Sequence, residues 1–211
     1  AKQKGVKVLR LSASVETSHA SNGLAGQVLR ARFGLPHASD LDLARGKLRG
    51  ALGEMLSARQ LGDAVQLLGY LLGIPAGDVS DRAKTLMWER GLSSLVSLLK
   101  RDVKKNPHLL VVDGMDEADV RDRQLLETLS SGLLGGHIMM VWIGRGAASL
   151  PSPPKEGLSR VELAPFSDRG SEALAISMLS RMSAAPDELV AALAKRANGN
   201  PRRMEQVLRA L

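Results

Sequence analysis

Residues 108–119, HLLVVDGMDEAD, decide the fold class of this chain. The four aliphatic residues from Leu109 to Val112 are too few for a core helix, and two of them are β-branched, so they predict a strand buried on both faces. Four acids then follow within the seven residues from Asp113 to Asp119. In open α/β sheets, ligands bind beyond the carboxyl ends of the strands, so the same stretch also predicts a binding site.

The acids at this strand end admit two interpretations. Carboxylates there can hold a hard cation, directly or through water, and can position a water molecule for attack on a phosphate. Alternatively, they form the acidic first turn of a helix, where negative charge complements the helix dipole. The second interpretation is favoured for Glu117 and Asp119 taken alone, and the first for the whole pattern with Asp113 and Asp116.

The rest of the chain alternates strands with helices. A strand is expected at 6–12, a second continuous apolar and therefore buried strand at 137–143, and a short strand at 159–163. Apolar spacing predicts helices at 22–33, 40–58, 60–72, 80–105, 117–134, 168–182, 186–197 and 202–211. This order is typical of a parallel sheet flanked by helices, here an α/β core over residues 1–165 followed by a small helical lid over 166–211.

The composition limits the classes of function. The chain of 211 residues has a net charge of +7, which permits binding to polyanions without requiring it. Aromatic residues make up only 2%, so a base-stacking surface for nucleic acid is not supported. The sequence contains no cysteine, which excludes disulfides, thiolate zinc sites and cysteine nucleophiles. No run approaches the ~18 apolar residues of a membrane span, so we expect no span and a cytoplasmic location.

Three segments resemble P-loop NTPases of the AAA+ and STAND (signal-transduction ATPase) classes. Residues 109–117, LLVVDGMDE, resemble the Walker B motif of the NACHT branch, in which four hydrophobic residues precede Asp-Gly-hydrophobic-Asp-Glu. Residues 140–145, MVWIGR, stand where such proteins carry a strand that ends in a polar sensor, and only Arg145 matches that pattern. Residues 197–202, ANGNPR, are similar to the lid motif, with Arg202 three residues after the glycine.

The resemblance implies a role for five residues. Asp113 would hold the Mg²⁺ of a bound nucleotide through water, and Asp116 or Glu117 would orient or deprotonate the attacking water. Arg145 would sense the γ-phosphate, and Arg202 would reach from the lid onto the phosphates, a task that suits the forked guanidinium group. Two simpler interpretations stay open: Arg145 as a loop arginine paired with a nearby acid, and Arg202 as a charge on a helix face.

The phosphate loop of the family, Gly-x-x-x-x-Gly-Lys-Ser/Thr after a first strand, does not occur in this sequence. Gly46-Lys47 is followed by Leu48 and lies within a helical pattern, so it is not such a loop. The chain therefore resembles an AAA+/STAND-like NTPase core that is incomplete at its N-terminus, either a fragment or a degenerate member. ATP and Mg²⁺ are expected as cofactors only if the phosphate loop is supplied, because its amides and lysine cradle the phosphates.

Three functions are compatible with these features. The first is a nucleotide-binding switch in a larger signalling ATPase. Its partners would be other domains of that protein, other proteins, or further copies of the chain in a homo-oligomer. The second is a scaffold with an NTPase fold that hydrolyses nothing and binds a protein or nucleic acid. The third is an AAA+ ATPase acting on DNA, which rests on residues 199–202 and the positive charge. Whether this chain is an enzyme is left open by the sequence.

Overall fold

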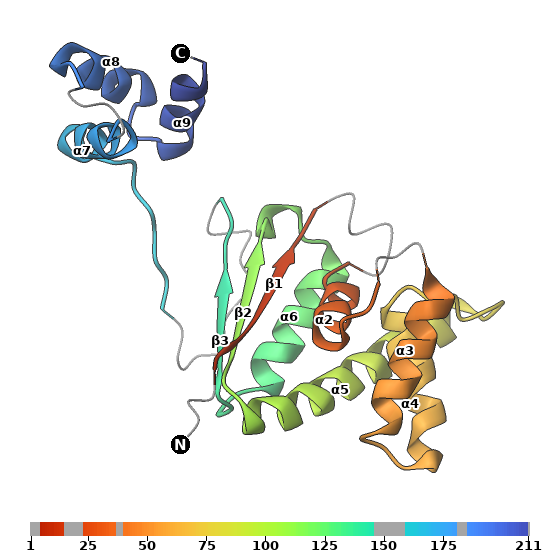
Figure 1. The fold of residues 1–211 in the computed structure, drawn as a ribbon. Coiled ribbons are helices and arrows are strands. Elements are labelled where there is room, and N and C mark those ends of the chain that lie inside the picture. Colours follow the sequence, from red (N-terminus) through yellow and green to blue (C-terminus); the bar gives the residue numbers. More distant parts are fainter. Residues whose placement is uncertain (1–4, 15–22, 37–39, 146–158, 181–184, 211) are drawn as a thin grey trace. The chain divides into compact units, whose positions relative to one another are not determined.

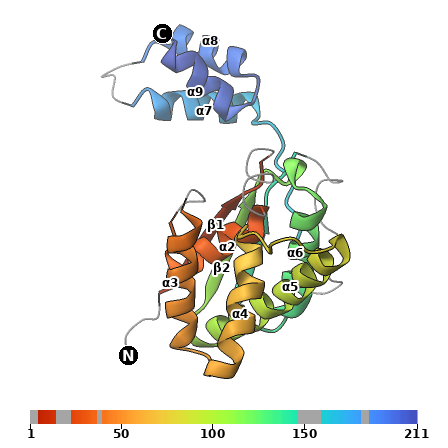
Figure 2. The same ribbon diagram turned by 90° about the vertical axis from the view of Figure 1, so that its right-hand side faces the viewer.

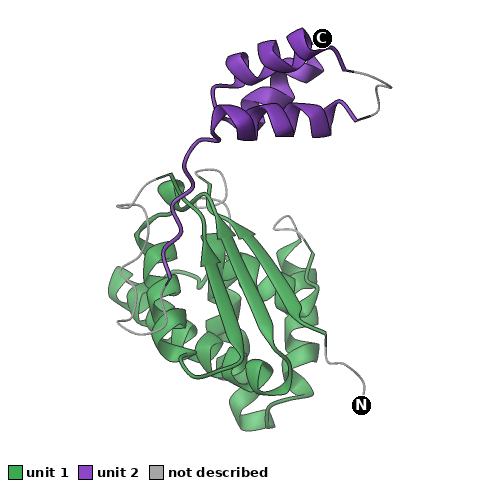
Figure 3. Cartoon of the chain, turned by 90° about the vertical axis from the view of Figure 1, so that its left-hand side faces the viewer, with its two compact units in different colours: residues 1–158 green, residues 159–211 purple. Residues whose placement is uncertain are grey.

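The computed structural model describes residues 5–14, 23–36, 40–145, 159–180 and 185–210. They belong to two compact units, Ala1–Leu158 and Ser159–Leu211, which Figure 3 shows in different colours. Unit 1 contains strands and helices, whereas the described part of unit 2 contains helices only. The sequence-based division after residue 165 assigns the segment 159–165 to the first domain, while contacts within the chain assign it to the second unit.

Unit 1 is built on a three-stranded parallel sheet (Figure 1). Strand β2 (His108–Asp113) lies between β1 (Lys7–Ser12) and β3 (Ile138–Trp142). The register pairs Val112 with Leu11 on one side and with Trp142 on the other. The prediction of an α/β fold with a parallel sheet flanked by helices is therefore confirmed.

The helices of unit 1 lie on one face of this sheet (Figures 1 and 2). They are α2 (Gly23–Phe33), α3 (Leu41–Gly53), α4 (Ala58–Leu71), α5 (Asp81–Lys105) and α6 (Val120–Gly132). Side chains fix where three of them begin, because Asp40, Ser80 and Asp119 each accept a hydrogen bond from a backbone N–H in the first turn. The core between helices and sheet is aliphatic and includes Leu9, Leu11, Leu24, Leu95, Leu110, Val112, Leu125 and Leu126.

The expectation that two strands are buried on both faces is wrong. In β2, Leu110 and Val112 are buried, whereas Leu109 and Val111 are only half-buried. In β3 no side chain is fully buried, and Met139 is 64% exposed. The reason is that the described helices of unit 1 cover a single face, so burial alternates along each strand.

Several element boundaries differ from the sequence-based expectation. The helix expected at 40–58 ends at Gly53, and the helix expected from residue 117 begins at Val120 after a 3₁₀ turn, η1 (Met115–Glu117). The short strand expected at 159–163 is wrong: these residues form no strand, and Leu163 is 89% exposed. A strand is defined by hydrogen bonds to a neighbour, and the structure pairs this segment with none of the described strands.

Unit 2 is a bundle of α7 (Asp168–Met178), α8 (Asp187–Ala197) and α9 (Pro201–Arg209). Its small core includes Ala175, Leu179, Val190, Leu193, Ala197 and Met204. The turn between α8 and α9 requires Gly199, whose φ is +73° and whose position for a Cβ atom would lie 2.7 Å from the carbonyl oxygen of Phe166. The backbone N–H of Phe166 also donates to the carbonyl of Gly199, at 2.9 Å, so residue 166 is tied to this turn.

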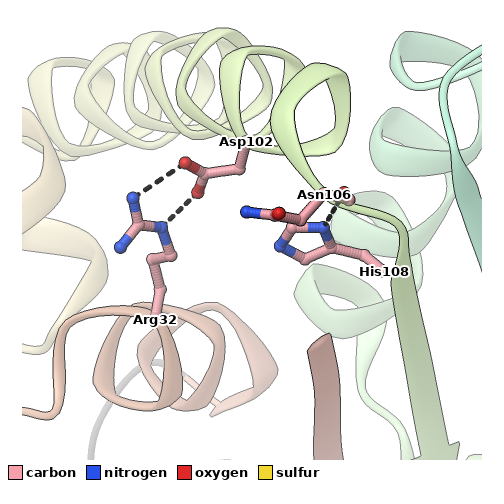
Figure 4. A network of polar contacts seen from close by, with 4 residues as sticks. All are labelled: Arg32, Asp102, Asn106 and His108. Atoms are coloured by element: carbon pink, nitrogen blue, oxygen red, sulfur yellow. Dashed lines mark hydrogen bonds and ion pairs between the residues drawn. The ribbon is translucent and has the colours of Figure 1, made fainter. Parts of the chain in front are cut away.

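A polar network ties three elements together at the amino ends of the strands (Figure 4). Asp102 of α5 accepts hydrogen bonds from Nε and Nη2 of Arg32 in α2, the latter at 2.8 Å. At the start of β2, Nδ1 of His108 donates to the carbonyl oxygen of Asn106 at 2.8 Å. Beside them, burial lowers the pKa of Lys7 and the charge of Arg32 lowers it further, whereas Asp102 raises it. This network lies at the opposite end of the sheet from the acids that follow β2.

Asp122 of α6 holds the beginning of α2. Its carboxylate is almost completely buried and accepts the backbone N–H of Leu24, 98 residues earlier in the chain, at 2.8 Å. The contact satisfies one of the N–H groups that a helix leaves unpaired at its start. A position for a Cβ atom on Gly23 would lie only 2.3 Å from Oδ1 of Asp122, so a glycine is needed at residue 23.

We expect Asp122→Ala to lower the free energy of unfolding by about 1–3 kcal/mol, because it leaves a buried N–H at the start of α2 without its acceptor. The measurement is urea denaturation followed by circular dichroism. Asp63→Ala is the matched control, since Asp63 is exposed on α4 and a surface change of this kind stays within about 0.5 kcal/mol. Equal effects of the two substitutions would contradict the capping role.

Candidate functional site

The predicted acids lie at the carboxyl end of β2, the central strand. The loop after Asp113 turns at Gly114, which has a φ of +75°, and continues into η1. Met115 anchors this loop, because its side chain is fully buried and its backbone N–H donates to the carbonyl of Ile143 at 3.0 Å. The end of β2 is thereby fixed to the residues that follow β3.

Gly114 also brings the loop close to the end of β1. A Cβ atom at this residue would lie 2.4 Å from the carbonyl oxygen of Ala13. The backbone N–H of Ala13 donates to the carbonyl of Asp113 at 2.8 Å, which extends the pairing of β1 with β2 past the strand ends. The carboxyl ends of all three strands are therefore joined by backbone hydrogen bonds around Asp113.

The side chain of Asp113 is exposed at this edge of the sheet. Its Oδ1 accepts the backbone N–H of Gly114 at 2.8 Å, which fixes the orientation of the carboxylate. Among the described residues, no three Asp, Glu or His side chains come close enough to form a metal site by themselves. A single carboxylate fits Mg²⁺, however, because this ion keeps several waters and commonly takes its other ligands from substrate phosphates.

Two predicted site residues, Asp116 and Arg145, are brought together. Nε of Arg145 lies 3.3 Å from Oδ2 of Asp116, and the backbone N–H of Arg145 donates to Oδ1 of the same carboxylate. The side chain of Arg145 is 86% exposed and that of Asp116 is 29% exposed. This pairing is the geometry that the simpler interpretation of Arg145, a loop arginine beside an acid, predicts.

The other two acids differ in what they contact. Asp119 is the N-cap of α6, and its Oδ1 accepts the backbone N–H of Asp122 at 2.8 Å, so this acid has a structural role. Glu117 is exposed in η1, where its backbone N–H donates to the carbonyl of Gly114 at 2.9 Å. The structure thus holds the backbone of Glu117 and leaves its carboxylate at the surface.

Arg202 lies in unit 2, in the first turn of α9, and is exposed. This turn is well defined, since Pro201 occupies the first helical position and Oδ1 of Asn200 accepts the backbone N–H of Arg203 at 3.1 Å. The break between the last two helices, expected from the sequence at residues 198–201, is present. The contact of Arg202 with phosphates stays a prediction.

Two residues that shape this edge were not predicted from the sequence. Gln27 of α2 binds both backbone groups of Ser12, accepting its N–H at 2.9 Å and donating to its carbonyl at 2.8 Å. Gly114 permits the left-handed turn and the close approach to Ala13. A glycine directly after the strand carried a signal for such a turn, whereas a single glutamine within a helix carried none.

Comparisons of the chain with protein-family models, with curated proteins and with solved structures find no match. Within the described parts of the chain, no helix has the length and apolar character needed to cross a membrane. A hollow of about 580 Å³ lies between α5 and α6 and is lined by Ser93, Val96, Glu127, Thr128, Ser131 and Gly132. None of the predicted site residues lines it, so the acids at the end of β2 remain the candidate site.

We expect Gly114→Ala to lower the free energy of unfolding by at least about 2 kcal/mol, because alanine is strained at a φ of +75° and its Cβ would meet the Ala13 carbonyl. Gly50→Ala is the matched control: Gly50 lies inside α3, and its added Cβ would meet nothing within 4 Å. That substitution is expected to raise the free energy of unfolding by about 0.5–1 kcal/mol. Chemical denaturation of both variants tests the pair, and a destabilisation shared by both would contradict it.

Proposed function

We propose that this chain is the ATP-binding switch module of a STAND/AAA+-type signalling ATPase. The observation that carries the proposal is the position of Asp113, Asp116 and Glu117 directly beyond the central strand of a parallel sheet, beside Arg145 from the end of the neighbouring strand. Ligands of open α/β sheets bind at this end. Carboxylates with an arginine at such a place suit a magnesium-bound phosphate.

Each residue of the site has a proposed role. Asp113 holds Mg²⁺, through water, with a carboxylate that the Gly114 N–H orients. Of the two candidates for activating water, Glu117 is favoured, because Arg145 already engages the carboxylate of Asp116. A carboxylate free to accept a proton is what a water-activating group requires.

The two arginines are proposed to bind phosphate oxygens. Arg145 forms an exposed ion pair, which contributes little stability, so a doubly charged γ-phosphate competes effectively for its guanidinium group. Arg202 of unit 2 is the proposed second phosphate contact, exposed in the first turn of α9. The phosphate loop itself is absent from this sequence, so ATP and Mg²⁺ are proposed as cofactors only where that loop is supplied.

A scaffold function without hydrolysis is the second candidate, and the charge distribution favours it. The last turns of α5 expose Lys100, Arg101, Lys104 and Lys105, and the net charge is +7. If a nucleic acid is the partner, filter binding over a salt series will show a steep loss of affinity as phosphate contacts are screened. Hydrolysis stimulated by DNA would instead indicate the third candidate, an AAA+ ATPase acting on DNA.

In the full-length gene product, we expect Glu117→Gln to lower ATP turnover by about 100-fold or more, because the amide cannot accept the proton of water. ATP affinity, measured by calorimetry, should change little. Asp119→Asn is the matched control, since asparagine keeps the N-cap of α6 while removing one negative charge nearby. Unchanged turnover in Glu117→Gln would refute its role in activating water.

For the 211-residue chain alone, we expect an ATP dissociation constant no tighter than the millimolar range, about −4 kcal/mol of binding free energy. The reason is that the amides and lysine of a phosphate loop, which supply most contacts to the β- and γ-phosphates in this class, do not occur in the sequence. Isothermal calorimetry with and without Mg²⁺ measures this. A micromolar constant would mean that other groups build the phosphate site.

A further inference from the structure

The amino edge of the sheet in unit 1, where the three strands begin, carries a dense group of cations. Four of them are exposed on the last two turns of α5: Lys100, Arg101, Lys104 and Lys105. At 3.6 residues per turn they spread over about 140° of the helix circumference and about 7.5 Å of its length. Among the described residues, none of the four forms an ion pair. We call this group the basic end of α5.

The charge of the basic end is not balanced by acids in the segments that build this edge. Asp102 is the only acidic residue in three described segments, 5–7, 95–107 and 133–138. Its carboxylate is engaged by Nε and Nη2 of Arg32 in α2. Cations in the last turn of a helix complement the helix dipole, which accounts for one pair of the four but not for the pair one turn earlier. An unpaired group of cations attracts an anionic partner.

Exposed aliphatic side chains flank these cations on both sides. Val6, directly before β1, is 58% exposed, and Leu134, in the turn between α6 and β3, is 59% exposed. On the first side, the backbone N–H of Lys7 donates to the carbonyl of Pro107, just after α5, at 2.9 Å. The start of β1 is thereby held beside the end of the helix.

The turn between α6 and β3 lies against α5 on the other side. A Cβ atom added to Gly136 in this turn would lie 2.9 Å from Cγ2 of Val103, in the last turns of the helix. The carbonyl of His137 accepts the backbone N–H of His108 at 2.8 Å, which joins the turn to the start of β2 as well. The basic end of α5 and both aliphatic side chains therefore lie at one edge of unit 1 (Figure 1).

This combination suits an anionic lipid bilayer better than a nucleic acid. Each cation held near an anionic membrane strengthens binding by about fivefold. Aliphatic side chains add to this, because they leave water for the boundary between head groups and acyl chains. Binding to the phosphates of a nucleic acid would leave Val6 and Leu134 in water, and the three segments contain no Phe, Trp or Tyr on which bases could stack.

We propose that the amino edge of unit 1 docks on a membrane surface that contains anionic lipids. The basic end of α5 contacts the lipid phosphates and carboxylates, and Val6 and Leu134 enter the boundary below the head groups. The opposite edge of the sheet, with Asp113 and Arg145, faces away from the bilayer. The inference goes beyond the proposed function, because it requires no nucleotide and names lipid as the partner.

Co-sedimentation of the 211-residue chain with vesicles, without nucleotide, tests the role of charge. We expect binding to phosphatidylcholine vesicles that contain phosphatidylserine to be at least about tenfold tighter than binding to phosphatidylcholine alone. The double variant Lys100→Gln/Lys104→Gln should bind the anionic vesicles about 25-fold more weakly, at about fivefold for each cation.

The matched control is Arg82→Gln/Arg90→Gln, which removes the same charge from exposed positions of the same helix. These positions lie about 15 Å or more along the helix from Lys100, beyond the screening length of about 8 Å at physiological salt. The control should therefore change binding by less than about twofold. Circular dichroism of each variant checks that the fold is kept.

The absence of cysteine from the sequence allows a direct measurement of insertion. Leu134→Cys, labelled with an environment-sensitive fluorophore, should shift its emission to shorter wavelength when anionic vesicles are added and should not shift with duplex DNA. Leu86→Cys on α5 is the matched control, since the native side chain is 53% exposed against 59% for Leu134. Its emission should stay the same in both cases.

Three results would overturn the proposal. Equal binding to vesicles with and without phosphatidylserine would exclude an anionic lipid surface. Equal losses for the two double variants would show that total charge, and not this edge, decides binding. Unshifted emission from the labelled Leu134→Cys variant would exclude insertion, and tight binding of duplex DNA that the Lys100→Gln/Lys104→Gln variant loses would then identify nucleic acid as the partner. None of these measurements involves ATP, so their failure is distinct from failure of the nucleotide proposal.

Discussion

The pairing of β2 with a parallel strand on each side is the constraint on which the rest of unit 1 depends. Because the strands are parallel and in register, their carboxyl ends reach the same edge of the sheet. There the backbone N–H of Ala13 donates to the carbonyl of Asp113, and Ile143 forms backbone hydrogen bonds with Val112 and Met115. The acids after β2 and the arginine after β3 are far apart in sequence and meet only because of this register. A shift of β3 by one residue would turn its side chains to the opposite face and separate Arg145 from Asp116.

The helices of unit 1 pack on this sheet, but on one face only. Leu9, Leu110 and Val112 point toward α2, α5 and α6 and form a close-packed aliphatic core. The polar tie between Arg32 and Asp102 and the buried cap of Asp122 on α2 fix the helices relative to one another at both ends of the strands. The side of the sheet that faces away contributes no comparable core within the described residues, so this unit uses half of the apolar surface that its strands present.

The sequence was sufficient for the order and type of the main elements, because their signals are local. Ser80 and Pro107 bracket the long helix α5, and the run from Leu109 to Val112 ends on an acid and a glycine, so these boundaries could be predicted closely. One-sided burial could not be predicted, since a run of four aliphatic residues looks the same whether one or both faces are covered. Nor could the sequence reveal that Asp122 caps a helix 98 residues away or which acid pairs with Arg145, because the partners in these contacts are set by the fold.

The pairing of Arg145 with Asp116 suits both a structural and a nucleotide-sensing arginine, because the ion pair is exposed. An ion pair with one partner 86% exposed is screened by water and contributes roughly 0–1 kcal/mol, so exchanging the acid for a phosphate costs little. The backbone N–H of Arg145 also donates to Oδ1 of Asp116, and this contact does not involve the guanidinium group. Asp116 therefore fixes the position of the loop after β3 while leaving the guanidinium group available to an anion. The same geometry serves a resting ion pair and a sensor, and the two differ only in whether a phosphate reaches this edge of the sheet.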